Sequence, residues 1–123
     1  TWKNILSKAD STEKITHLVE LNTNFKNDLE VEDIFSGKVL NSDIDILGHV
    51  NHLKYVEYIY NSITQEEIEK LKNYNTLELY FQKEMVLGDE YKVSKGYLDE
   101  KVVFIITNKT NNKRAFTLVL SNE

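Results

Sequence analysis

The sequence contains no cysteine, and its 123 residues include only three histidines and no long apolar run. Without cysteine the chain can form neither a disulfide nor a zinc-cysteine site, and the histidines are too scattered to supply the missing ligands. We therefore expect no metal and no cofactor. The lack of a long apolar run predicts that no segment spans a membrane. The start carries no signal sequence, which favours a cytoplasmic location, and Thr1 in the place of methionine suggests a trimmed or partial chain.

The sequence also has no excess of basic residues over acidic ones. The formal net charge is -5, and acidic and basic side chains are interspersed along the chain. A nucleic-acid or anionic-membrane surface needs a concentration of basic residues, so we expect no nucleic acid among the partners. The length suits a single core, and we predict an N-terminal helix and connector over residues 1–33 and one compact domain over residues 34–123.

The N-terminal region shows one helix signal. Asp10 and Glu13 begin and end a capping-box pattern, and apolar residues follow at helical spacing. This pattern predicts an amphipathic helix over residues 11–21. Residues 22–33 are rich in Asn, Asp and Glu and show no sustained period, which is typical of a surface connector.

The most apolar helix is predicted over residues 50–63. Apolar side chains occur nearly all round it, so other structure should cover most of its sides. Its narrow polar stripe consists of Lys54, Glu57 and Asn61. We interpret three of its aromatic residues as core side chains with buried hydroxyls rather than as a ligand-binding set: Tyr55, Tyr58 and Tyr60. A second capping box at residues 64–67 predicts a short helix after it.

Beyond residue 75 the apolar period changes from helical to two. Strands are predicted over residues 35–40, 76–85, 91–98, 102–107 and 115–120, the last four separated by short polar turns. This spacing is typical of an antiparallel meander. A sheet that curls around the apolar helix would bury that helix, so we predict an α+β fold with an antiparallel β-sheet wrapped around a long central helix.

Polar side chains are concentrated where the apolar helix begins. Asp43, Asp45, Gly48, His49 and Asn51 lie where the free backbone N–H groups of a helix start are expected. A thioester or ester carbonyl would find donors there for a developing oxyanion, and Asp45 could activate water or orient His49. Gly48 permits close approach of a ligand to the backbone. Asp, Gly and Asn also cap helices and shape turns, so capping without any chemistry remains the alternative.

Three further polar residues have weaker patterns. Glu84 is predicted at the end of the strand over residues 76–85, where it could be a second acid or an ordinary solvent-facing charge. His52 is predicted on the surface in the first turn of the apolar helix, and His17 on the exposed face of the N-terminal helix.

Two segments resemble a known family. Residues 42–55 read S-D-I-D-I-L-G-H-V-N-H-L-K-Y, which resembles the signature D-x-N-x-H-V-N-N-x-K-Y of acyl-ACP thioesterases. Residues 79–85 read L-Y-F-Q-K-E-M, which is similar to the strand in that family that ends in Glu followed by Cys. The resemblance covers most of residues 35–123. It implies the hot-dog fold, and specifically the C-terminal of two tandem hot-dog repeats, with residues 1–33 resembling the connector that precedes it.

The resemblance also implies roles for individual residues. The implied catalytic residues are Asp45, His49, Asn51 and Glu84, and the implied substrate-binding residues are Leu47, Gly48 and Val50. Leu47 stands where the family has its catalytic asparagine, and Met85 where the family often has cysteine. The form D-x-D-x-x-G-H-V-N, with an apolar residue before Gly48, also resembles single-domain acyl-CoA thioesterases of the same fold, which rely on the aspartate.

Two functions therefore come into question. The leading hypothesis is a thioester hydrolase that releases fatty acids from acyl-ACP or acyl-CoA by carboxylate-assisted attack of water. The alternative, motivated by Leu47, is a non-catalytic acyl-binding or dimerisation module. A lone hot-dog unit leaves a sheet edge open, so we expect a homodimer or pairing with a second hot-dog repeat.

Overall fold

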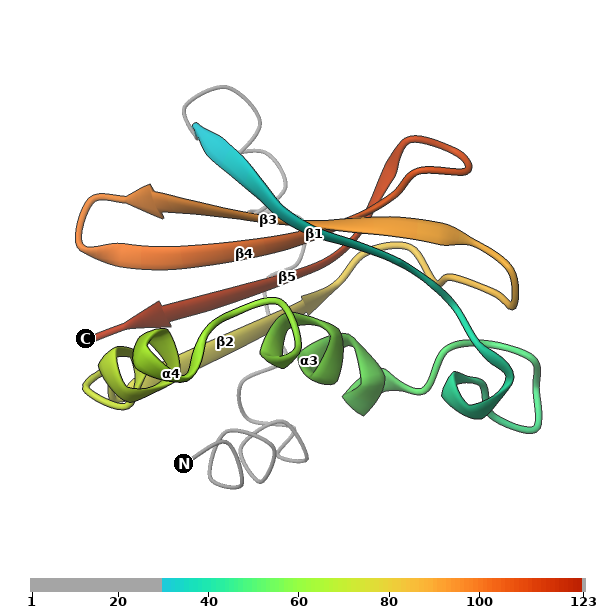
Figure 1. The fold of residues 1–123 in the computed structure, drawn as a ribbon, viewed down its shortest axis with the longest axis horizontal. Helices are drawn as coiled ribbons and strands as arrows, with labels where there is room; N and C mark the ends of the chain where they lie inside the picture. The colour runs from blue at the N-terminus through green and yellow to red at the C-terminus, as the bar shows by residue number, and fades with distance from the viewer. Residues whose placement is uncertain (1–29, 123) are drawn as a thin grey trace.

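The computed structural model describes residues 30–122 of the chain. The strands are β1 (Val31–Lys38), β2 (Thr76–Phe81), β3 (Glu90–Leu98), β4 (Lys101–Asn108) and β5 (Lys113–Ser121), and the helices are the short 3₁₀ helix η2 (Asn41–Asp43), α3 (His52–Tyr60) and α4 (Gln65–Leu71). The five strands form one sheet in the order β1-β3-β4-β5-β2, with every neighbouring pair antiparallel (Figure 1). This arrangement confirms the predicted α+β class.

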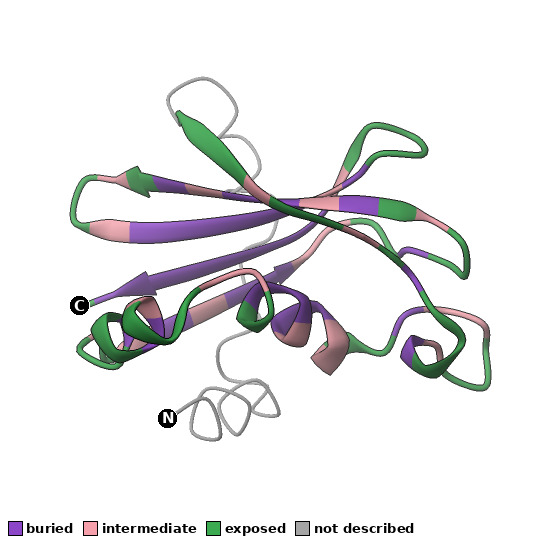
Figure 2. Cartoon of the chain, in the orientation of Figure 1, coloured by how far each residue is buried: buried purple, intermediate pink, exposed green. Residues whose placement is uncertain are grey.

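The helix α3 packs against one face of the sheet and forms the centre of the core. It buries Tyr55, Val56, Tyr58 and Ile59 against the inward side chains of the strands. Most of β4 and β5 and part of α3 are coloured as buried in Figure 2. The prediction was wrong for Tyr60, which is 40% exposed. The sheet therefore covers this helix on fewer sides than its composition suggested.

The helix is also shorter than the predicted span of residues 50–63. Asn51 is its N-cap, and its side chain accepts a hydrogen bond from the first helical turn. Val50 lies outside the helix because its N–H donates to the carbonyl oxygen of Met85, 3.0 Å away. A contact distant in sequence thus determines where the helix begins. The capping signal for α4 is confirmed, since the hydroxyl of Thr64 caps that helix.

The strand β2 ends earlier than predicted. The N–H groups of Gln82 and Lys83 both donate to the carbonyl oxygen of Ala115, at 3.0 and 3.2 Å, and this pairing ends the regular ladder with β5. Residues 82–89 instead form the connection from β2 to β3. Glu84 therefore lies in this connection and not at the end of a strand.

Strand β4 is buried on both faces. Val102, Phe104 and Ile106 belong to the main core around α3, whereas Val103 and Ile105 belong to a second buried cluster. The other members of the second cluster, on the face of the sheet opposite α3, are Tyr80 and Val119. The two-residue period of residues 76–85 places Tyr80 on the same face as Glu78 and Gln82, which predicts a polar face. That prediction was wrong because this side of the sheet also carries apolar residues.

The first strand begins earlier than predicted. β1 pairs with β3 from Val31 onward, whereas the pattern predicted a strand over residues 35–40. Gly37 of β1 lies directly against the ring of Tyr91, and a Cβ atom there would come within 2.5 Å of its hydroxyl oxygen. Two predicted turns are confirmed, and at their tips Asp99 and Asn112 adopt positive φ angles of 56° and 60°.

The predicted helix over residues 11–21, with His17, lies outside the described residues. The division of the chain at residue 33/34 stays a prediction. Within residues 30–122, no helix is both long enough and apolar enough to cross a membrane.

Candidate active site

The loop before α3 is closed by the side chain of Asp45. Its Oδ1 accepts hydrogen bonds from the N–H groups of Leu47 at 2.9 Å and His49 at 3.2 Å. The backbone closes the same turn, since the N–H of Asp45 donates to the carbonyl of His49 at 2.8 Å. Gly48 adopts a φ of +84°, which glycine tolerates without a steric penalty. Asp45 therefore shapes the turn that carries His49.

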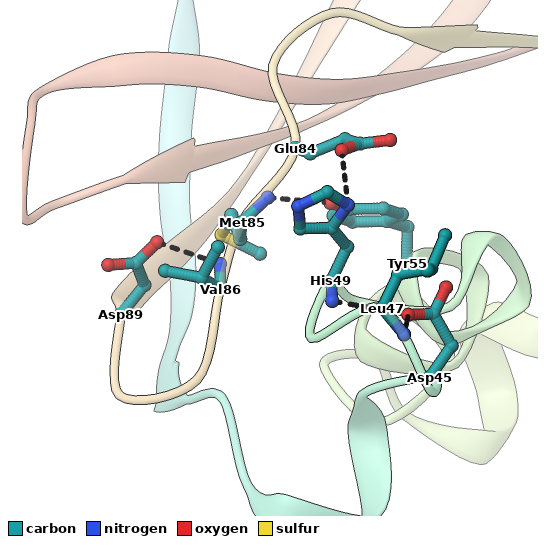
Figure 3. A network of polar contacts seen from close by, with 8 residues as sticks. All are labelled: Asp45, Leu47, His49, Tyr55, Glu84, Met85, Val86 and Asp89. Atoms are coloured by element: carbon teal, nitrogen blue, oxygen red, sulfur yellow. Dashed lines mark hydrogen bonds and ion pairs between the residues drawn. The ribbon is translucent and has the colours of Figure 1, made fainter.

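The imidazole of His49 meets the carboxylate of Glu84, which comes from the β2–β3 connection. Nδ1 of His49 lies 2.9 Å from Oε2 of Glu84, and the two side chains are 44% and 55% exposed (Figure 3). The backbones of His49 and Val86 also form an isolated antiparallel bridge. A carboxylate on one ring nitrogen holds the imidazole in one orientation and leaves the other nitrogen to face a substrate or water.

Asn51 lies beside this pair in sequence but performs a backbone role in the structure. Its side-chain oxygen accepts a hydrogen bond from the N–H of Leu53 at 3.0 Å, which is the N-cap contact of α3. Its own N–H donates to the carbonyl of Asp43 at 3.0 Å. Asn51 therefore caps α3, as the capping alternative predicted. A role of its side chain in binding substrate stays a prediction.

The three predicted substrate-binding residues lie in different environments. Leu47 is at the tip of the loop and 75% exposed, Gly48 is half-buried, and Val50 is only 1% exposed. Val50 therefore packs beneath the loop, while Leu47 presents an apolar side chain at its surface. Their contact with a substrate stays a prediction.

Asp43 differs from the other polar residues of this loop because its carboxylate is buried. Oδ2 accepts hydrogen bonds from the hydroxyl of Tyr58 at 2.9 Å and from the N–H of Leu40 at 3.0 Å, and Nζ of Lys54 lies 4.0 Å from Oδ1. Burial, followed by this hydrogen bond, raises the pKa of Tyr58 well above its ordinary value. Asp43 thus anchors the loop to α3 rather than facing a ligand.

A cavity of about 310 Å³ opens beside Glu84. Its walls are formed by His52, Tyr55, Phe81, Gln82, Lys83, Glu84 and Ala115. His52 is exposed, as predicted, and stacks on Phe81 with 4.3 Å between the ring centroids. The acid of the His49–Glu84 pair is therefore at the edge of a space that could admit part of a ligand. Across residues 30–122, no three His, Asp or Glu side chains are grouped in a way that could hold a metal ion.

Tyr55 makes a polar contact in addition to the core packing that the sequence predicts for it. The backbone N–H of Met85 donates to its hydroxyl oxygen, 3.0 Å away. The available signal was its place at the end of the motif over residues 42–55, but the partner of the hydroxyl is a backbone group thirty residues away. No side-chain pattern marks such a partner.

The five-stranded antiparallel sheet packed on α3, with an acid and an imidazole at the start of that helix, defines a hot-dog domain of the thioesterase type. The chain belongs to the acyl-ACP thioesterase family, because the family model for the acyl-ACP thioesterase C-terminal domain matches residues 26–122. No curated protein matches the sequence.

Solved structures show the same fold. An acyl-ACP thioesterase from Bacteroides thetaiotaomicron has a TM-score of 0.60 at 20% identity; the match covers 92% of this chain and 41% of that one. This chain thus spans less than half of that relative. A probable thioesterase from Escherichia coli has a TM-score of 0.53 at 15% identity, covering 70% of this chain and 77% of the other. A hypothetical protein from Staphylococcus aureus in complex with CoA has a TM-score of 0.57 at 17% identity, covering 75% and 72%.

Proposed function

We propose that this domain hydrolyses fatty acyl thioesters carried on acyl carrier protein or coenzyme A. The observation that carries the proposal is the His49–Glu84 pair beside the start of α3, whose acid lines a cavity, in a member of this family. A relative solved with CoA supports the carrier class, although the choice between the two carriers is open to experiment.

The proposed reaction needs a base, a polarised carbonyl and a leaving thiolate. A carboxylate, Asp45 or Glu84, accepts a proton as the oxygen of water attacks the carbonyl carbon, and the positive end of the α3 dipole stabilises the resulting oxyanion. The tetrahedral intermediate then collapses, the carbon–sulfur bond breaks, and the thiolate takes up the proton. The products are a free fatty acid and the carrier thiol. His49, held by Glu84, would orient the water or relay its proton.

One observation favours the alternative of a non-catalytic acyl-binding or dimerisation module. Leu47 replaces the amide that the family carries there, and Oδ1 of Asp45 is already occupied by two backbone N–H groups of its own turn. A site that keeps the loop but lacks this amide could bind an acyl group without hydrolysing it.

Exposed apolar residues near the site support pairing with a second hot-dog unit, either a homodimer or another repeat. They lie on the two loops joined by the His49–Val86 bridge and the Val39–Asp89 hydrogen bond: Leu40, Ile46, Leu47, Val86 and Leu87. A second unit seated on this apolar rim would exclude water from the site. A cytoplasmic location, where both carriers occur, is part of the same proposal.

The hydrolysis test measures thiol release from medium- and long-chain acyl-CoA and acyl-ACP. Because the chain has no cysteine, a thiol reagent detects only product. Asp45→Asn keeps an oxygen at Oδ1 and therefore the turn, but removes the charge; it should lower kcat strongly. Hydrolysis that survives both Asp45→Asn and Glu84→Gln would refute the carboxylate mechanism. No turnover by the wild type, with a gain in Leu47→Asn, would favour the binding module.

The pairing test is sedimentation at several protein concentrations. Leu47→Ser with Leu87→Ser should weaken self-association, whereas Tyr97→Ser, which changes an exposed aromatic residue on β3, should not. A monomer that is fully active at all concentrations would exclude a homodimer.

A further inference from the structure

We infer that Tyr55 is a positioning residue whose hydroxyl fixes the Met85 peptide and thereby holds Glu84 against His49. For its effect on catalysis, this inference rests on the proposed function. The geometric part concerns the folded protein alone and can be tested without turnover.

Both polar groups of Met85 are bound by segments that surround the start of α3. Its N–H donates to the hydroxyl oxygen of Tyr55 at 3.0 Å (Figure 3). Its carbonyl oxygen accepts the N–H of Val50, also at 3.0 Å. Glu84 and Val86 are the residues on either side, and each contacts His49, the first by its carboxylate and the second by the backbone bridge. The backbone position of Met85 therefore determines where Glu84 and Val86 lie relative to His49.

The Tyr55 hydroxyl can hold this point because its ring is buried and packed against three other aromatic rings. The side chain is only 1% exposed. The ring stacks on Phe116 with 5.3 Å between centroids and an interplanar angle of 16°, and it meets Phe81 and Tyr58 edge-on at 6.1 and 6.2 Å. Burial raises the pKa of Tyr55, with the Met85 hydrogen bond opposing the shift, so the hydroxyl stays neutral near pH 7. A fixed, neutral oxygen thus faces the connection.

The Tyr55 hydroxyl binds the peptide that joins Glu84 to Met85, whereas the other contacts of the β2–β3 connection act on neighbouring peptides. The start of the connection is held at the Ala115 carbonyl, and its end is held by Asp89, whose Oδ2 accepts the N–H of Val86 at 3.0 Å. Glu84 lies between these anchors and its side chain is half exposed, so packing does not determine its direction. Met85 is fully buried, and a buried N–H without an acceptor is costly, so loss of the hydroxyl should displace this peptide.

The first experiment uses NMR of the full chain at one fixed pH, with the His49 Nδ1 resonance assigned through its loss in His49→Gln. Tyr55→Phe should move this resonance toward its position in Glu84→Gln and should remove the slow hydrogen exchange of the Met85 amide. Tyr58→Phe is the matched control, because it deletes a buried hydroxyl of the same helix that binds Asp43 instead. The control should leave the slow exchange of the Met85 amide in place.

The second experiment measures acyl-thioester hydrolysis. A misplaced acid should lower kcat by about 10- to 100-fold in Tyr55→Phe, while KM changes by less than about twofold. In a Glu84→Gln background, Tyr55→Phe should cost no more than about a further twofold, because a residue that acts through Glu84 has no effect once that acid is gone.

An unchanged His49 resonance in Tyr55→Phe, or an equal loss of Met85 amide protection in Tyr58→Phe, would overturn the inference. So would full additivity of the Tyr55→Phe and Glu84→Gln losses. If Tyr55→Phe does not fold, 3-fluorotyrosine at position 55 weakens the acceptor while keeping the ring, and a smaller shift in the same direction is expected. If the wild type hydrolyses nothing, the proposed function fails while the NMR result still decides the inference.

Discussion

Nδ1 of His49 lies 2.9 Å from Oε2 of Glu84, and both side chains are about half exposed. An exposed ion pair contributes less than about 1 kcal/mol to the free energy of unfolding, because water and salt screen it. We therefore expect Glu84→Gln to unfold in urea within about 1 kcal/mol of the wild type but to lose most thioester hydrolysis.

The control for this change is Glu57→Gln, which removes the 2.9 Å contact with Lys54 elsewhere on α3 and should keep the activity. A Glu84→Gln variant that retains wild-type kcat would remove Glu84 from the reaction.

Two substitutions of Asn51, the N-cap of α3, distinguish a role in stability from a role in catalysis. Asn51→Ala deletes the oxygen that accepts the Leu53 N–H and should lower the free energy of unfolding by about 1 kcal/mol. Asn51→Ser retains a capping oxygen and should restore most of that loss. If the amide also orients substrate, both variants should lose kcat, as measured by thiol release. Thr64→Ala, which removes the cap of α4, should be destabilised to a similar extent yet keep its kcat. Full activity in Asn51→Ser would limit Asn51 to capping.

Gly37 has no room for a side chain. A Cβ atom would lie 2.5 Å from the hydroxyl oxygen of Tyr91, and that ring is itself stacked on Tyr58 with 4.3 Å between centroids. Gly37→Ala should therefore lower the free energy of unfolding by about 1 to 3 kcal/mol, measured by urea denaturation, because the rings must shift. Ser36→Ala, at the neighbouring exposed position, should have almost no effect. Equal stability of both variants would contradict the close packing.

Alkaline pH should lower the free energy of unfolding because the buried hydroxyl of Tyr91 loses its proton. Burial, and secondarily the negative charge of Asp43, raises the pKa of Tyr91 to about 12, from an ordinary value of 10.0. Because the folded state keeps this proton after the unfolded state has lost it, the stabilisation is full below pH 10 and declines as pH rises from 10 to 12. Urea unfolding across this range should show a steeper decline for the wild type than for Tyr91→Phe. Parallel curves would contradict the assignment.

The sequence predicts the elements well where the signal is local. The apolar residues around Tyr55 and Val56 indicate a core helix, and the alternation in residues 76–81 indicates a strand, because each period is set by neighbours along the chain. The sequence does not predict the second apolar cluster, because Tyr80 shares its strand face with the polar residues Glu78 and Gln82, while its partners Val103 and Val119 come from other strands.

The candidate site shows the same limit. The loop over residues 43–51 was recognisable as a polar cluster, but its division into a buried anchor, Asp43, and an exposed turn residue, Asp45, depends on Tyr58 in α3. The end of β2 depends on the carbonyl of Ala115, so the connection that carries Glu84 could not be read from its own residues. In both cases, hydrogen bonds between segments distant in sequence determine the local structure.

Met85 acts in this arrangement through its backbone, since its N–H and carbonyl oxygen make the two hydrogen bonds while its side chain is buried. Those bonds would form with any residue except proline, which lacks the N–H. The difference between Met85 and the cysteine of the resembled family signature therefore leaves these two backbone hydrogen bonds unchanged. A sequence signature records only the side chain at position 85. The structure shows that this position contributes through its main chain, whose course is kept when the side chain is changed.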